Sequence, residues 1–454
     1  MERDPLAPRA SPAAPPASGA AAASPGSRGA GGEPSRAYAN YVLAALVAVA
    51  ALNIVDRHLF GLLIEPIKQE LGLSDTWMGL LAGFAFAVFY TVCGLPVARW
   101  ADRGVRRSII AIGLFLWSGM TALCGLSQNV LQLALARIGV GIGEAAGAPP
   151  SHSLVCDYFP PERRASALAI TSMGGSLGLI LALLGGGFLA ERYGWRAAFV
   201  AAGLPGLGLA LLVRLTVREP VRGRFDAPRA RVPQASTREA LRFLFGLRAY
   251  RHLIAAGSLH SFAGIGAASW NAVFLMRVHG MSVAQAGTRL ALLNASFAAL
   301  GITLWGFAVD RLAARDLRWY QWLPALGTAA ALPFLLGFLL WPDPALAMLF
   351  LAPASLFAGA WVGPGHAMHQ GLARPELRAT SSALALLIMN LIGLGLGPTA
   401  VGFLNELLLP RFGAEAVRYS LLLVAVASLW GAAHNLLAAR TLRQDLGAKD
   451  RPGP

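Results

Sequence analysis

The chain has 454 residues, of which 56% are hydrophobic and only 13% are charged. Soluble globular proteins carry about 25% charged residues, so the composition excludes an ordinary soluble domain and indicates membrane helices of about 20 apolar residues each. The formal net charge of +15 calls for an explanation, because a charge of this size in a soluble protein would indicate nucleic-acid binding.

Twelve apolar stretches of spanning length divide the chain. A segment rich in Pro, Ala, Gly and Ser, residues 1–36, precedes them and is expected to be a disordered tail. The stretches lie at about 38–63, 76–98, 108–126, 131–151, 166–189, 196–216, 252–275, 288–309, 321–341, 345–367, 380–404 and 417–438. We therefore predict an all-α membrane protein with an N-terminal six-helix bundle (37–216), a basic cytoplasmic linker (217–250), a C-terminal six-helix bundle (251–439) and a cytoplasmic tail (440–454).

The basic residues indicate how the chain crosses the membrane. If the N-terminus is cytoplasmic, 29 of the 38 Lys and Arg residues fall on the cytoplasmic side, seven fall on the other side, and Arg57 and Arg137 lie inside the membrane. Cytoplasmic loops of membrane proteins generally carry an excess of Lys and Arg. The sequence thus predicts a multi-pass protein of the cell inner membrane with both termini in the cytoplasm, and no nucleic acid is needed to explain the charge.

The second half of the chain repeats features of the first. Asp102-Arg103, after the second stretch, recurs as Asp310-Arg311 after the eighth. Six further residues recur at one offset of 214 positions: Pro150, His152, Pro161, Glu162, Arg164 and Ala165 are matched by Pro364, His366, Pro375, Glu376, Arg378 and Ala379. Two six-helix pseudo-repeats follow, an arrangement found in transporters that bind their substrate between two parallel halves.

Four ionisable residues lie inside the predicted spans of the first half, namely Asp56, Arg57, Arg137 and Glu144. Each central charge costs about 2.5–3.5 kcal/mol on insertion scales, so the charges are expected to pair. At ~1.5 Å rise per residue, Asp56 and Arg137 both lie roughly 12–14 Å below the outer surface and are predicted to meet, with Glu144 ~10 Å deeper. We expect Asp56 and Glu144 to exchange protons while Arg137 switches between them, and Arg57 to hold an anionic head group. Buried ion pairs that only fix helix packing are the alternative.

The second half has no Asp, Glu, Lys or Arg deep in a span. A cavity with one charged wall and one apolar wall favours an amphiphilic substrate. Besides the four charged residues, the candidates for substrate binding are Asn53, Trp270, Asn271, Trp361 and Asn390.

The loops offer a candidate gate on the cytoplasmic side. Arg103 could bridge to Asp157, which ends the fourth stretch, and the contact would exist only when that side is closed. Arg106 and Arg107 are expected to be ordinary loop charges. The predicted gating residues are Asp102, Arg103, Asp157, Asp310 and Arg311.

Several motifs resemble those of a known family. Residues 98–107 (ARWADRGVRR) resemble the major facilitator signature, and 136–145 (ARIGVGIGEA) is similar to the fourth-helix motif of that superfamily. LNIVDR at 52–57 and REPVRG at 218–223 narrow the resemblance to spinster-like transporters, with this chain as a bacterial member. The resemblance implies a major facilitator fold, a role of the four intramembrane charges in proton coupling and substrate binding, and lysolipid-like substrates as in eukaryotic members.

We therefore expect a proton-coupled secondary active transporter that works by alternating access on an amphiphilic, lysolipid-like or organic-anion substrate. It is expected to act as a monomer in the membrane without a metal or other cofactor, driven by the proton gradient. A carrier of small organic anions or sugar acids is the alternative, and it would need a second polar wall. A polytopic enzyme acting on lipids is a further alternative. It would need a nucleophile with a base or a metal cluster, and no acid in the sequence near His366 and His369 completes such a cluster.

Overall fold

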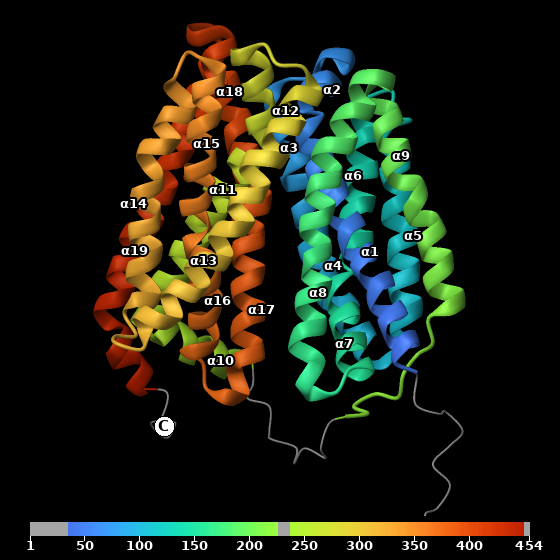
Figure 1. Ribbon diagram of the computed structural model, residues 1–454, viewed down its shortest axis with the longest axis vertical. Helices are drawn as coiled ribbons and strands as arrows, with labels where there is room; N and C mark the ends of the chain where they lie inside the picture. Colours follow the sequence, from blue (N-terminus) through green and yellow to red (C-terminus); the bar gives the residue numbers. More distant parts are fainter. Residues whose placement is uncertain (1–34, 226–236, 449–454) are drawn as a thin grey trace, which may run out of the picture.

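The computed structural model describes residues 35–225 and 237–448, and its helices form two bundles that run side by side (Figure 1). The first half comprises α1 (Arg36–Leu62), α2 (Ile64–Leu71), α3 (Asp75–Ala82), α4 (Phe84–Arg103), α5 (Arg106–Cys124), α6 (Val130–Glu144), α7 (Ala148–Tyr158), α8 (Pro161–Ile180), the π-helical turn η1 (Leu181–Gly185) and α9 (Gly186–Thr216). Nearly all of the predicted N-terminal tail lies outside the described residues.

The second half is built in the same way. It comprises α11 (Arg248–His279), α12 (Val283–Arg289), the π-helical turn η2 (Leu290–Ala295), α13 (Ser296–Ala313), α14 (Trp319–Leu340), α15 (Pro344–Ala358), the short turn η3 (Gly359–Trp361), α16 (Val362–Gly371), the short turn η4 (Pro375–Leu377), α17 (Arg378–Met389), the π-helical turn η5 (Asn390–Leu396), α18 (Gly397–Phe412), the short turn η6 (Gly413–Glu415) and α19 (Ala416–Ala448). Two findings refine the predicted boundaries. The linker contains a helix, α10 (Thr237–Gly246), and α19 continues through most of the segment predicted as a tail.

The helices agree with the predicted number of membrane crossings. Nine helical stretches of the described chain are long and apolar enough to cross a membrane. Two of them, of 56 and 68 residues, have room for two crossings each, because one crossing takes about 20 residues. Their chains turn at Gly194 and Gly413, whose φ angles of 83° and 53° favour glycine. With the 32-residue α11, the arrangement is consistent with twelve crossings in two halves.

The outer surface of the bundles is apolar. Large side chains such as Phe115, Leu211, Phe307 and Leu349 are more than half exposed. A soluble monomer rarely exposes so many large apolar side chains, whereas lipid tails cover them at little cost. The apolar outer surface therefore indicates that the bundles lie in a bilayer.

Ion pairs join the two halves at one end of the molecule. We call the end where α10 and the linker lie the linker end, and the opposite end the far end (Figure 1). At the far end, Arg277 of α11 donates two hydrogen bonds to Asp75 of α3, at 2.6 and 2.8 Å, and one to Glu65 of α2, at 2.7 Å. The Nζ atom of Lys68 lies 2.7 Å from the Asp75 carboxylate. Two anions and two cations thus balance in one cluster.

Two further carboxylates strengthen the contact at the far end. Glu191 of the first half accepts hydrogen bonds from Ser282 Oγ and from the backbone N–H of Ala284, at the start of α12. Glu406 of the second half accepts a hydrogen bond from the backbone N–H of Thr76, at the start of α3. Each carboxylate therefore lies at a helix N-terminus of the opposite half, where the helix dipole favours negative charge. These contacts close the far end.

Candidate functional site

Glycines of α6 bring three helices together around the predicted charges. A Cβ atom on Gly141 would lie 2.7 Å from the carbonyl oxygen of Phe86 in α4, and one on Gly143 would lie 2.6 Å from the backbone nitrogen of Trp117 in α5. A larger residue cannot be placed so close to a neighbouring backbone, so the glycines set the helix spacing. Arg137 and Glu144 of the same helix are buried as a result, with 2% and 1% of their surface exposed.

Glu144 forms an ion pair with Arg57 of α1. Arg57 Nε lies 2.6 Å from Glu144 Oε2, and the Glu144 side chain is fully buried. The Arg57 guanidinium also lies over the ring of Tyr90, 4.8 Å from its centroid. Glu144 Oε1 is buried without a hydrogen-bond partner of ordinary geometry among the described residues, and Asn53 is a neighbour of this carboxylate. One oxygen of Glu144 is therefore committed to Arg57 and the other is available.

Arg137 has a different environment. Among residues 35–225 and 237–448, no carboxylate oxygen lies within 4.0 Å of its guanidinium. Its Nε donates to the carbonyl oxygen of Leu81 at 3.3 Å, and its guanidinium lies 4.5 Å from the ring centroid of Phe60 and 5.2 Å from that of Phe86. Rings and one carbonyl only partly offset a buried charge, so this guanidinium has room for an anion.

The predicted ion pair between Asp56 and Arg137 is wrong. Asp56 is 2% exposed, and in the described part of the chain no Lys or Arg nitrogen lies within 4.0 Å of its carboxylate. Thr121 of α5 is a neighbour of Asp56, and Arg137 and Glu144 are near enough to act on it electrostatically. The prediction rested on depth alone. Consecutive residues of a helix point about 100° apart, so Asp56 and Arg57 cannot both face Glu144 in the same way, and it is Arg57 that forms the ion pair.

The predicted substrate residues of the second half fall into two groups. The indole of Trp270 is fully buried and donates to the carbonyl oxygen of Pro398 at 3.0 Å, so it joins α11 to α18, and its role in substrate binding stays a prediction. Asn271 and Trp361 line a cavity, and Trp361 stacks on His260 with a centroid distance of 5.5 Å. Asn390 is half-buried at the start of η5.

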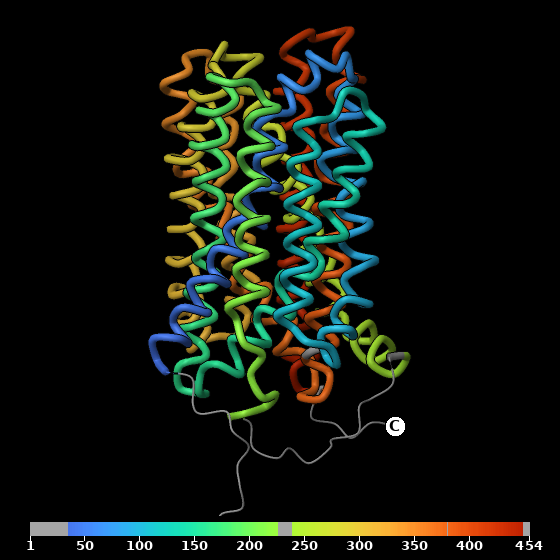
Figure 2. Tube along the Cα trace, turned by 90° about the vertical axis from the view of Figure 1, so that its right-hand side faces the viewer, coloured from blue at the N-terminus to red at the C-terminus, as the bar shows by residue number. Residues whose placement is uncertain are grey.

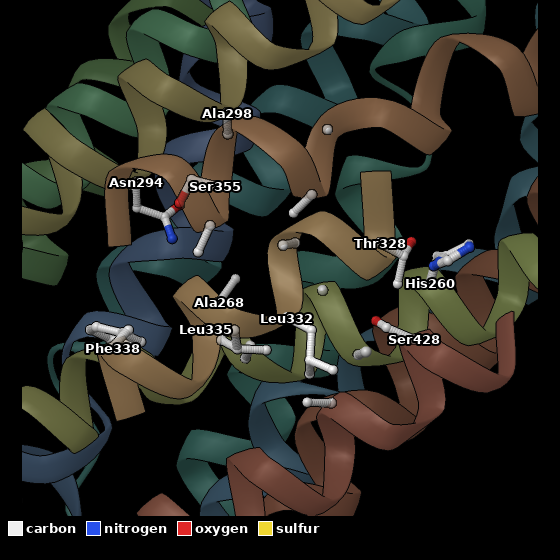
Figure 3. Close-up of a pocket in the computed structure, with 18 of the residues that line it drawn as sticks. His260, Ala268, Asn294, Ala298, Thr328, Leu332, Leu335, Phe338, Ser355 and Ser428 are labelled. Atoms are coloured by element: carbon white, nitrogen blue, oxygen red, sulfur yellow. The ribbon is translucent and has the colours of Figure 1, made fainter. Parts of the chain in front are cut away.

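The cavity lies inside the second half and has a volume of about 300 Å³. Its walls come from α11, α13, α14, α15 and α19, and the close-up view shows mostly aliphatic side chains around it (Figure 3). Leu332 and Leu335 are typical of these, and Phe338 adds an aromatic ring. Its polar side chains are mainly amides, hydroxyls and one imidazole, namely those of His260, Asn271, Asn294, Thr328, Ser355 and Ser428. Sequence reasoning expected an apolar wall but missed this cavity, because five separate helices form it.

At the linker end, Asp157 binds Arg106 and not Arg103. Arg106 is 1% exposed, and its Nη1 lies 2.5 Å from Asp157 Oδ2 while its Nε lies 2.7 Å from Glu219 Oε1. Arg107 donates from its backbone N–H to Glu219 Oε2 and from Nη1 to the carbonyl oxygen of Val217. The expectation that Arg106 and Arg107 are ordinary loop charges is therefore wrong.

The start of the linker completes this network. Arg222 donates to the backbone carbonyl oxygens of Ala101, Asp102 and Gly104, and the backbone N–H of Gly223 donates to Asp157 at 3.0 Å. The segment 218–223 thus folds back onto the loop after α4. Both partners of Asp157 belong to the first half or to its adjoining linker, so the network holds one half together and does not join the halves.

The other predicted gating residues are exposed in the structure. The side chains of Asp102 and Arg103 face solvent, and so does that of Arg311. Asp310 accepts a hydrogen bond from the hydroxyl of Tyr320 at 3.1 Å, within the second half. A gating role for these residues stays a prediction.

Comparisons with known proteins assign the chain to a family. A family model described as the Major Facilitator Superfamily matches residues 46–398. The chain belongs to this superfamily. An MFS-type efflux pump of Mycolicibacterium smegmatis is 39% identical over 414 residues, which cover 91% of this chain and 95% of the pump. The cis,cis-muconate transport protein of Acinetobacter baylyi is 29% identical over 324 residues, 68% of this chain and 75% of that protein.

Solved structures of the superfamily agree with this assignment. A bacterial homolog of the human lysosomal transporter Spinster, in an inward-facing and unoccupied conformation, matches with a TM-score of 0.84 and 33% identity over 92% of this chain and 100% of that chain. The same homolog in an inward-facing, occupied conformation gives a TM-score of 0.81. The spinster-like assignment is thereby confirmed. This Major Facilitator Superfamily chain is a multi-pass membrane transporter of small molecules, and the enzyme alternative is wrong.

No group of three or more His, Cys, Asp or Glu residues that could hold a metal ion occurs within the described ranges.

Proposed function

We propose that this transporter couples the movement of an anionic amphiphile to a proton gradient by alternating access. The observation that carries the proposal is the buried guanidinium of Arg137, which has no carboxylate within 4.0 Å among the described residues, beside an Arg57 that Glu144 already neutralises. An anionic head group would supply the missing counter-charge. The substrate prediction for Arg57 is revised accordingly, with Arg137 as the residue that binds the head group.

The cavity of the second half is evidence that the substrate has an apolar tail. About 300 Å³ lined mainly by aliphatic and aromatic side chains accommodates a hydrocarbon segment far better than a second charge. The two halves thus offer complementary environments, a cation in one and an apolar space in the other. A lysolipid-like anion has both features in one molecule.

Proton coupling is assigned to Asp56 and Glu144. A carboxyl buried without an ion-pair partner is more stable with a proton, and a carboxylate held by a guanidinium is more stable without one. Asp56 is in the first situation and Glu144 in the second. An anion that binds near Arg137 changes the field at both carboxyls, which links occupancy to protonation. The proton gradient then replaces any cofactor as the source of energy.

The contacts between the halves at the far end indicate which side of the transporter is closed in this state of the alternating-access cycle. The ion cluster of Arg277 closes the far end, which we assign to the outside of the cell inner membrane. The linker end, where α1 begins and α19 ends, is assigned to the cytoplasm in agreement with the excess of basic residues there. Rocking of the halves about the midplane would break the far-end cluster. A single chain contains both halves, so a monomer suffices.

A carrier of small organic anions is the second candidate. It is favoured by relatives such as the cis,cis-muconate transport protein and a probable L-galactonate transporter of Escherichia coli, which is 27% identical over 278 residues. A small dianion or sugar acid needs polar contacts from both halves of the protein. The cavity of the second half offers only neutral polar groups, which argues for the amphiphile.

Transport by the full-length protein in liposomes tests the proposal. Uptake of a fluorescent anionic lysolipid, cis,cis-muconate and galactonate is measured with and without an imposed pH gradient. We expect gradient-dependent uptake of the lysolipid above that of protein-free liposomes, and its loss when a protonophore is added. Transport of muconate or galactonate without lysolipid transport would establish the second candidate. Uptake that ignores the gradient would refute proton coupling.

A further inference from the structure

The linker contains a short amphipathic helix, α10, whose inner face is fixed to the second half. Ala240 and Leu244, together with Leu247 just after the helix, are buried in one cluster with residues of α11, α17 and α19. The partly buried ring of Phe243 lies under the guanidinium of Arg374, 4.4 Å from its centre. These contacts set the rotation of α10 about its axis, so its opposite face points away from the protein.

That opposite face combines two arginines with two large apolar side chains. Arg238, Leu241, Arg242 and Phe245 follow one another at helical spacing (i, i+3, i+4, i+7), so they share one side of α10. Leu241 and Phe245 are each 36% exposed, and both arginines are exposed. No ion pair within 4.0 Å joins either arginine to an acid in the described part of the chain. We call these four residues the outer face of α10.

The position of α10 places this face at the level of the membrane surface. α10 ends at Gly246 and the long apolar helix α11 begins at Arg248. Figure 2 shows α10 at the periphery of the linker end, outside the bundle. Arg248 and Arg251, in the first turn of α11, are exposed as well and add to the positive charge. A helix this close to the start of a membrane span must lie beside the lipid head groups.

We propose that the outer face of α10 binds anionic phospholipids of the adjacent leaflet. Leu241 and Phe245 would enter the boundary between head groups and acyl chains, and Arg238 and Arg242 would bind the lipid phosphates. Helices with Arg on one part of the surface and Leu and Phe on another bind membranes in this way, through buried apolar area and attraction to anionic lipids. The lipid contact would hold the linker and the second half at a fixed height. The inference depends on membrane insertion and not on the proposed substrate.

Lipid binding to the purified full-length protein tests the proposal. The variant with Arg238→Gln and Arg242→Gln is compared with a control that carries Arg163→Gln and Arg378→Gln, two exposed arginines elsewhere at the linker end. Retention of phosphatidylglycerol and of phosphatidylcholine is measured by native mass spectrometry during lipid titration. We expect the α10 variant to bind phosphatidylglycerol more weakly by about five-fold for each arginine removed, with phosphatidylcholine unchanged. Added glycerol phosphate should not compete, because the apolar contact needs an acyl chain.

A second variant separates the two parts of the contact. The variant with Leu241→Ser and Phe245→Ser is expected to bind both phosphatidylglycerol and phosphatidylcholine more weakly, because it removes the apolar contact that both lipids make. Equal phosphatidylglycerol retention by the α10 variant and the control would overturn the proposal. Competition by glycerol phosphate would also overturn it, since the site would then bind a soluble anion. Melting temperatures of all variants verify that the protein is folded.

Discussion

Arg57 of α1 and Glu144 of α6 form an ion pair, 2.6 Å from Nε to Oε2, across the core of the first half. The pair decides the roles of the two remaining charges. Glu144 compensates Arg57, so Arg137 is left to an anion and Asp56 is left without a cation within 4.0 Å among the described residues. The site is thus asymmetric before any substrate binds.

Replacing the buried carboxyls should abolish coupling to the proton gradient. In Glu144→Gln and Asp56→Asn, no proton can leave or bind at the substituted group, so gradient-driven uptake in liposomes should fall to near that of protein-free liposomes. Exchange of labelled for unlabelled substrate without a gradient should persist. Glu162→Gln, an exposed residue at the linker end, serves as the control. Full gradient-driven uptake by both carboxyl variants would refute the carrier assignment.

Replacing Arg137 should weaken binding of the anion. A charge-assisted hydrogen bond contributes about 1.5–3 kcal/mol, so Arg137→Gln is expected to weaken substrate binding roughly 10- to 150-fold. Arg137→Lys keeps the charge but loses the planar fork of the guanidinium, so its affinity for the substrate should lie between that of the parent protein and that of Arg137→Gln. Binding is measured by tryptophan fluorescence quenching. A neutral analogue of the substrate should bind the variant and the parent protein alike, and an equal loss for that analogue would contradict the head-group role.

The network at the linker end should stabilise the first half. Arg106→Gln leaves Asp157 and Glu219 without their buried cation, and loss of one partner of a buried pair costs about 3–5 kcal/mol. The Glu219 side chain is 22% exposed, so we expect the lower end of that range. Arg103→Gln should change stability by less than about 0.5 kcal/mol, because Arg103 is exposed. Thermal unfolding in detergent measures the stability of both variants. Equal losses of stability would favour the predicted contact between Arg103 and Asp157.

Breaking the far-end cluster should shift the transporter toward its outward-open state. Arg277→Gln removes the hydrogen bonds to Asp75 and Glu65, while Lys68 keeps part of the compensation. A loss of about 2 kcal/mol would change the ratio of the two states roughly 30-fold.

Distances between spin labels at Gln69 and Arg411, on opposite halves at the far end, report this shift. A longer-distance population is expected in Arg277→Gln but not in Arg192→Gln, an exposed residue of the first half. An unchanged distance distribution in Arg277→Gln would mean that packing alone closes the far end.

The close approach of α4 and α6 should make Gly141 intolerant of any side chain. A Cβ there would lie 2.7 Å from the carbonyl oxygen of Phe86, so Gly141→Ala should destabilise the protein by about 1–3 kcal/mol. Gly208→Ala is the matched control, because a Cβ at that helical position meets nothing within 4 Å. The control should leave the melting temperature unchanged or raise it. Equal melting temperatures of the two variants would show that α6 can move away from α4.

The sequence by itself determined the topology. A membrane-spanning helix is recognised by about 20 consecutive apolar residues. The repeats of Asp102-Arg103 and of Pro150 to Ala165 indicate two related halves. Both signals can be read from the sequence because each is local in the chain. The intramembrane charges were equally visible, since an ion in an apolar stretch stands out. In the structure Asp56, Arg137 and Glu144 are buried, and Arg57, whose side chain is 22% exposed, pairs with Glu144.

Only the tertiary structure decided which charges pair. Depth along a helix follows from residue number, but the direction in which a side chain points depends on how the helix is rotated against its neighbours. For Asp56 and Arg57 that rotation is the rotation of α1, which packs against Gly174 and Gly178 of α8 and presents Arg57 to Glu144. The same holds for Arg106, which reaches Asp157 and Glu219 only because the linker folds back. Contacts between distant segments depend on packing, and packing is a property of the whole fold.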